Sequence, residues 1–283
     1  MSLTDIFSDR SVSIALAPEL LTAVVRSGKR IVAHSEVHIA ASERPDGHWE
    51  GALNAFATYL RQAGVTLKGV PVSVVLTTRW CQLTMLPWSE ALLHEGSAQR
   101  FAQAQFAAIY GDVARHWATV CDDAPYGAAR LACAIERDFL EGLQHTARSL
   151  GHPCALVESV LSSAWRAMAG HQPQAFALIE PARLVLAAAA HGRIVAVQAQ
   201  ALRGHWERAL PAGWQQWSLR APEMGEIAQL ALIHRDQHGA GADPDQDQAH
   251  GLEPVFEPAM RAPGQPARSP NAGWAAPQGG SLR

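Results

Sequence analysis

The chain has 283 residues, 48% of them hydrophobic and 17% charged, with a formal net charge of −3 at pH 7. This composition is typical of a globular protein, and the length is sufficient for a large core. The 23 lysines and arginines are spread along the sequence, which argues against a nucleic-acid or anionic-membrane partner.

The first elements predicted along the chain are three strands followed by a helix. The strands span Val12–Ala17, Leu20–Arg26 and Ile31–Ala40, and a glycine-containing turn joins the last two. Apolar residues then recur at helical spacing from Trp49 to Leu60, and the following Gly64 is a typical helix end. The chain therefore opens with an antiparallel meander and a helix.

The next segment alternates strands and helices. An apolar strand begins at Val70, and a second strand runs from Trp80 to Pro87. A helix ends at Gly111, two strands follow at 116–121 and 130–135, and a further helix ends at Gly151. The sequence then predicts a strand over 154–158 and a helix that ends near Gly170.

The opening pattern returns in the stretch FALIEPARLVLAAAAHGRIVAVQAQAL. At a constant offset of 163 residues, Pro181 matches Pro18 and the sequence RIVA at Arg193 matches RIVA at Arg30. The same order of strand, proline turn, strand, glycine turn and strand occurs in both places. We infer an internal duplication.

Two β-β-β-α-β-α-type halves predict an α/β protein with the actin-like, duplicated ribonuclease-H-like fold. We expect the first half over residues 1–170, with an inserted hairpin and helices, and a shortened second half over 171–237. Residues 238–283 contain seven prolines and seven glycines, so we expect a disordered tail there.

In the actin-like fold, the resemblance implies that the first hairpin of each half grips nucleotide phosphates through an aspartate next to a glycine. The first hairpin here has Ala15, Ala17 and Pro18 in those places, and proline has no amide hydrogen. The second has Glu180 and Pro181. We expect Glu180 to be a turn residue paired with a nearby arginine, and we expect no catalytic residue, cofactor or metal.

The run VVLTTRWCQLTMLPWSEALLHEGSAQRFAQAQFAAIYG, from Val74 to Gly111, resembles a segment of the PilM-like type IV pilus assembly proteins and of the cytoplasmic domain of GspL-type secretion proteins. In these families a strand, an LPW-type strand end and a long helix ending in YG follow one another. The resemblance covers about residues 12–237. The chain lacks the magnesium and phosphate residues of a nucleotide-binding PilM and the transmembrane helix of a full GspL.

The resemblance implies a non-catalytic cytoplasmic scaffold that binds peptides of inner-membrane pilus or secretion components. No stretch of the sequence has the length and hydrophobicity of a signal peptide or a membrane helix, so we expect membrane association only through a partner. Two alternatives remain open. One is a divergent actin-like ATPase or sugar kinase that uses Glu180, and the other is a homo-oligomeric structural protein.

Three tryptophans crowd one polar stretch of the second half: Trp206, Trp214 and Trp217. Neither strand nor helix spacing is expected to place all three on one face, which makes them candidates for a partner surface. The alternative is that they cap the core of the second half. The four cysteines are too far apart for a metal knuckle or a redox pair, and we expect buried free thiols.

Overall fold

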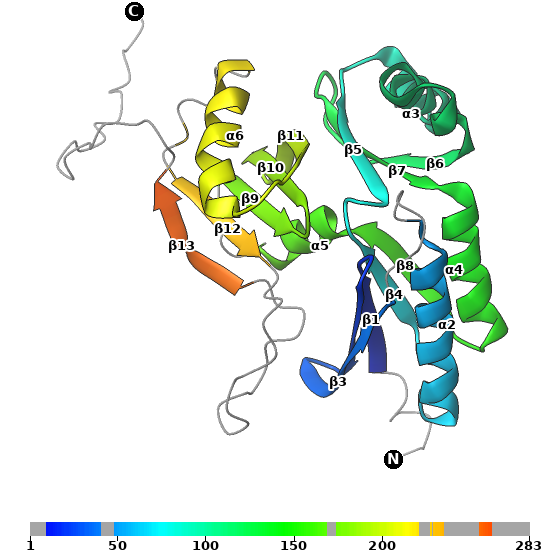
Figure 1. Ribbon diagram of the computed structural model, residues 1–283. Helices are drawn as coiled ribbons and strands as arrows, with labels where there is room; N and C mark the ends of the chain where they lie inside the picture. The colour runs from blue at the N-terminus through cyan, green and yellow to red at the C-terminus, as the bar shows by residue number, and fades with distance from the viewer. Residues whose placement is uncertain are drawn as a thin grey trace, which may run out of the picture.

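The computed structural model describes residues 10–40, 48–168, 174–220, 227, 229–234 and 255–261 (Figure 1). Within these residues the chain forms two five-stranded sheets and one three-stranded sheet, with helices packed against them. The fold is mixed α/β, as the sequence predicts.

The first five-stranded sheet has the order β3-β2-β1-β4-β8. Its strands are β1 (Arg10–Leu16), β2 (Leu20–Ser27), β3 (Arg30–His38), β4 (Val72–Leu76) and β8 (Cys154–Ser159). The meander β1-β2-β3 is antiparallel, whereas β4 is parallel to β1 and β8 is parallel to β4. Parallel neighbours need crossover connections, and helices α2 (Glu50–Ala63) and α4 (Arg137–Ser149) lie in them.

Helices α2 and α4 lie side by side against this sheet (Figure 1). Phe56 and Leu60 of α2 and Phe139 and Leu143 of α4 are fully buried in one core with β1, β2 and β4. These residues recur every four positions, which is the helical spacing that the sequence shows. Helix α2 ends at Gly64, whose φ of 50° suits glycine.

An inserted unit separates β4 from α4 in the sequence. It contains β5 (Cys81–Leu86), β6 (Trp117–Cys121) and β7 (Arg130–Glu136) in the order β5-β7-β6, helix α3 (Glu95–Tyr110), and the 3₁₀ helices η2 (Glu90–Leu93) and η3 (Gly111–His116). Helix α3 covers one face of this small sheet (Figure 1), and Phe106 is fully buried between them.

The second five-stranded sheet has the order β11-β10-β9-β12-β13. Its strands are β9 (Ala175–Glu180), β10 (Arg183–Ala190), β11 (Arg193–Ala201), β12 (Gln229–His234) and β13 (Val255–Arg261). Helix α5 (Val160–Ala167) precedes β9, and α6 (Trp206–Arg220) lies between β11 and β12. Strand β12 is parallel to β9, as β4 is to β1, so the two halves share four strands of one topology.

The two meanders match residue by residue at the predicted offset. Strands β2 and β3, shifted by 163 residues, give the bounds of β10 and β11. Both halves also carry a β-bulge at the same place, because Val32 is left without a partner on β2 and Val195 without one on β10. A shared bulge is a feature of backbone pairing that sequence identity alone did not show.

The three tryptophans belong to the core of the second half. Trp214 is 2% exposed and Trp217 is 5% exposed, and Trp206 packs against the same cluster. The prediction that no regular spacing aligns them was wrong, because positions 206, 214 and 217 fall on one face of α6. Burial therefore removes Trp214 and Trp217 as a partner surface and agrees with the alternative that they cap the core.

Part of the predicted disordered tail is a strand. Residues Val255–Arg261 form β13, which pairs antiparallel with β12. Pro258 falls at the shift in register, where a missing amide hydrogen interrupts no regular ladder. The proline and glycine count of the whole tail concealed this short segment, and residues 235–254 and 262–283 lie outside the described residues.

All four cysteines are free, but only Cys81 is buried and the other three are partly exposed. Among the described residues, no helix is long and apolar enough to cross a membrane.

Candidate functional site

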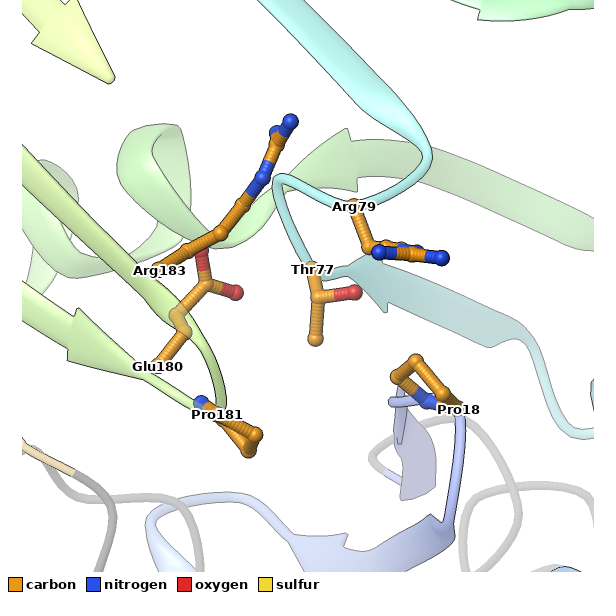
Figure 2. A pocket seen from close by; sticks show the side chains of 6 residues that line it. All are labelled: Pro18, Thr77, Arg79, Glu180, Pro181 and Arg183. Carbon is orange, nitrogen blue, oxygen red and sulfur yellow. The ribbon is translucent and has the colours of Figure 1, made fainter. Parts of the chain in front are cut away.

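The candidate site lies where the tips of the two matching hairpins approach each other (Figure 2). The turn after β1, the turn after β9 and the loop after β4 surround one small space. Six side chains line it: Pro18, Thr77, Arg79, Glu180, Pro181 and Arg183. The two hairpins are the places at which the resemblance implies that phosphates would be held.

Both turns are built by apolar strands that end at a proline. In the first, the amide of Ala17 donates to the carbonyl of Leu20 at 2.9 Å, and Pro18 has the fixed φ that a tight turn needs. In the second, Ala182 follows Pro181 with a φ of 58°, a conformation usually taken by glycine. Neither proline has an amide hydrogen to donate to an anion.

Glu180 is used to join the two halves. Its side chain is 7% exposed, and the amide of Thr78 donates to Oε1 at 3.1 Å and to Oε2 at 3.2 Å. The hydroxyl of Thr78 also donates to Oε2. Hydrogen bonds to a carboxylate in a buried place are among the stronger ones in proteins. The carboxylate thus closes the space between β9 and the loop after β4.

Arg183 holds the same loop from the other side. Its guanidinium donates to the carbonyl of Thr78, so both backbone groups of that residue are bound by the second hairpin. Its charge also acts on Tyr110 of α3, in the inserted unit. Burial raises the pKa of Tyr110, and the positive charge of Arg183 offsets part of that rise. We define the contacts of Thr78 with Glu180 and Arg183 as the Thr78 clamp.

The space inside the clamp is small. Its cavity volume is about 10 Å³, which is the room needed for about one water molecule. The hydroxyl of Thr77 lines this space and is buried without a hydrogen-bond partner in the described part of the chain. A single water fits this space and can pair with the hydroxyl, whereas a nucleoside triphosphate would require the two hairpins to separate.

Further contacts away from the clamp also join the two halves. Arg193 of β11 donates to the carbonyl of Ala129 at 3.2 Å and lies 3.6 Å from a carboxylate oxygen of Asp122. Leu83 and Met85 of β5 pack into the core that contains Phe176 of β9. Strand β11 thereby lies against the inserted sheet.

The predicted site residues are placed as follows. Ala15 and Ala17 are buried beside the first turn, and Pro18, Glu180 and Pro181 come together at the clamp. The sequence predicts Glu180 as a turn residue paired with an arginine. Its carboxylate accepts hydrogen bonds from Thr78, and Arg183 donates to the carbonyl of the same Thr78.

The sequence reasoning missed the loop after β4. The apolar strand predicted from Val70 ends at Leu76 as β4, so Thr77, Thr78 and Arg79 lie in the loop that follows. The polar residues that follow the apolar run were the available signal, because loops at the carboxyl ends of parallel strands commonly form sites. Within the described ranges, no group of three or more His, Cys, Asp or Glu residues is arranged to hold a metal ion.

No protein-family model matches the sequence, and no curated protein matches it. Many solved structures match the fold. The cytoplasmic domain of EpsL, an inner-membrane component of the type II secretion system of Vibrio cholerae, is 13% identical with a TM-score of 0.54, over 83% of this chain and 86% of that one.

A second is a protein of unknown function with an actin-like ATPase fold from Bacteroides thetaiotaomicron, 11% identical with a TM-score of 0.55, over 84% of this chain and 87% of that one. A third is a PilM-PilN type IV pilus biogenesis complex, 12% identical with a TM-score of 0.51, over 77% of this chain and 68% of that one. The predicted resemblance is confirmed for the fold: the chain has the duplicated actin-like fold that these proteins share.

Proposed function

We propose that the protein is a non-catalytic scaffold of a type IV pilus or type II secretion-like assembly. The fold supports this, because two of the similar structures belong to such assemblies by name. A fold alone is a weak argument for function, so the proposal depends on the site.

The Thr78 clamp is the observation that carries the proposal. Where an actin-like ATPase needs donors and an open space for phosphates, this chain has two prolines, a buried carboxylate already bound to Thr78, and room for about one water. These features favour a fixed arrangement of the two halves over one that opens and closes around a nucleotide.

A fixed arrangement suits a protein that presents surfaces to partners. The partners we propose are inner-membrane pilus or secretion components, and the place we propose for the chain is the cytoplasm, at the inner membrane through such a partner. Peptide docking on a preformed surface requires little reorganisation of the binding protein, which limits the entropy lost on binding.

Partner capture tests the proposal. The tagged full chain would be incubated with detergent-solubilised inner membranes of its host, with the tag alone as control, and bound proteins identified by mass spectrometry. We expect enrichment of membrane components of a pilus or secretion system. A capture that reproducibly lacks all of them, from membranes shown to contain them, would contradict the scaffold.

Catalysis is tested separately. We expect no magnesium-dependent ATP hydrolysis by the full chain above that of a Glu180→Gln variant. Hydrolysis that is present in the unmodified chain and lost in Glu180→Gln would instead make Glu180 a catalytic acid or base and would favour an ATPase or sugar kinase.

A further inference from the structure

A second concavity lies on the first sheet, between β3 and α2. It is an open groove of about 590 Å³. Its floor is formed by β2 and β3 and its wall by the end of α2 and η1 (Gly64–Leu67). Its lining includes Arg10, Val25, Ala33, Ser35, Val37 and Tyr59. We call this the β3–α2 groove.

The groove exists because the residues of β3 that face α2 are short. In the second half, Gln198 and Gln200 stand where β3 has Ser35 and Val37, and the side-chain amide of Gln200 reaches Gly213 of α6. The second half therefore fills its own groove with side chains. The first half leaves the same place open.

The open groove lies along an exposed sheet edge. Strand β3 is the last strand of its sheet in the described part of the chain, whereas the matching strand β11 is packed against β5 and β7. Tyr59 of α2 bridges part of the groove through a hydrogen bond with Ser35 of β3. Burial raises the pKa of Tyr59, and this hydrogen bond offsets part of that rise. An extended segment could lie along the rest of the edge, as in strand addition.

One cation lines the groove. Among the described residues that line it, Arg10 is the only charged one, and none carries a carboxylate. An apolar floor with one basic residue matches a segment that carries both apolar and acidic side chains.

Residues 1–9 of this chain have that chemistry. Their sequence is MSLTDIFSD, with apolar Leu3, Ile6 and Phe7 and acidic Asp5 and Asp9, and they lie outside the described residues. The segment joins β1 at Arg10, which is itself a lining residue. Phe7 is three residues from that point, a reach of about 10 Å when extended.

We propose that the β3–α2 groove binds residues 1–9 of the same chain. Phe7 fills the apolar floor, and an acidic side chain of the segment lies near Arg10. The segment covers the edge of β3 in the way that the inserted unit covers β11. This inference does not depend on the proposed scaffold function.

Hydrogen exchange of the full chain, followed by mass spectrometry, tests the proposal. We expect residues 3–9 to exchange roughly tenfold or more slowly than in a free peptide of the same sequence. Phe7→Ser, which alters no described residue, should return the exchange to the rate of the peptide. Ala33→Trp, which fills the groove, should do the same.

His34→Trp is the matched control, because it adds the same ring to the other face of β3 and should leave the protection unchanged. Exchange of residues 3–9 at the peptide rate in the unmodified chain would overturn the proposal. Protection that persists in Ala33→Trp would also overturn it, because the segment would then bind elsewhere. If Ala33→Trp does not fold, the Phe7→Ser result decides alone.

Discussion

Removing the carboxylate of Glu180 should weaken the joint between the two halves. The carboxylate accepts hydrogen bonds from the amide and the hydroxyl of Thr78. Each bond to a charged acceptor contributes about 1.5–3 kcal/mol, and the two together set an upper limit of about 6 kcal/mol. Removal also relieves the cost of burying the charge, so we expect Glu180→Ala to lower the free energy of unfolding by about 3 kcal/mol.

The assay is urea unfolding of the full chain, followed by tryptophan fluorescence and circular dichroism. Glu19→Ala is the matched control, because Glu19 is an exposed carboxylate in the corresponding turn of the first half, and we expect a change within about 0.5 kcal/mol. Thr78→Val removes the hydroxyl but keeps the amide. The pair Glu180→Ala and Thr78→Val should couple by about 1–3 kcal/mol in a double-mutant cycle.

Two outcomes would refute the reasoning about the clamp. The first is a Glu180→Ala variant as stable as Glu19→Ala, which would mean that the buried contacts contribute nothing net. The second is the absence of coupling with Thr78, which would mean that the loss in Glu180→Ala arises from another contact.

Substitutions at three further positions, Ala182, Gly111 and Asp122, test local features of the structure. Ala182→Gly should raise the midpoint of thermal unfolding slightly and Ala182→Val should lower it, because φ is 58° there; equal midpoints would argue against that conformation. Gly111→Ala, with φ 73° and ψ −152° at the end of α3, should cost about 1–3 kcal/mol in urea unfolding, whereas Gly96→Ala inside the same helix should cost nothing. Burial raises the pKa of Asp122 above its ordinary 3.8 more than Arg193 lowers it, so its contribution to stability is present at low pH and is lost as the pH rises through the folded-state pKa. The free energy of unfolding of the unmodified chain minus that of Asp122→Asn should therefore fall from pH 3.8 upward, and a rise would show that the ion pair dominates.

The sequence predicted the repeated meander well because its signals are local. Proline turns, a glycine turn and apolar strands recur at an offset of 163 residues, and the strands of the structure follow it. Helix ends were equally visible, since Gly64 and Gly111 both have positive φ. Such features depend on a few neighbouring residues, which a single sequence shows directly.

The clamp could not be predicted because its partners are distant in the sequence. Glu180 and Thr78 are 102 positions apart, and only the packing of the two halves brings them together. The tryptophans of α6 were misjudged for a different reason: Pro211 and the polar residues between them concealed a helical face. Strand β13 was missed because its pairing with β12, rather than its own composition, defines it.

Thermal unfolding of the full chain with and without millimolar magnesium–ATP tests the central claim most directly. A ligand at about a hundred times its dissociation constant stabilises by roughly 2.7 kcal/mol, which shifts the midpoint by roughly 5 °C or more in a chain of this size. The closed clamp predicts no shift. A clear shift would show that the hairpins at Pro18 and Pro181 open to admit a nucleotide, and it would contradict the account of a fixed, non-catalytic scaffold.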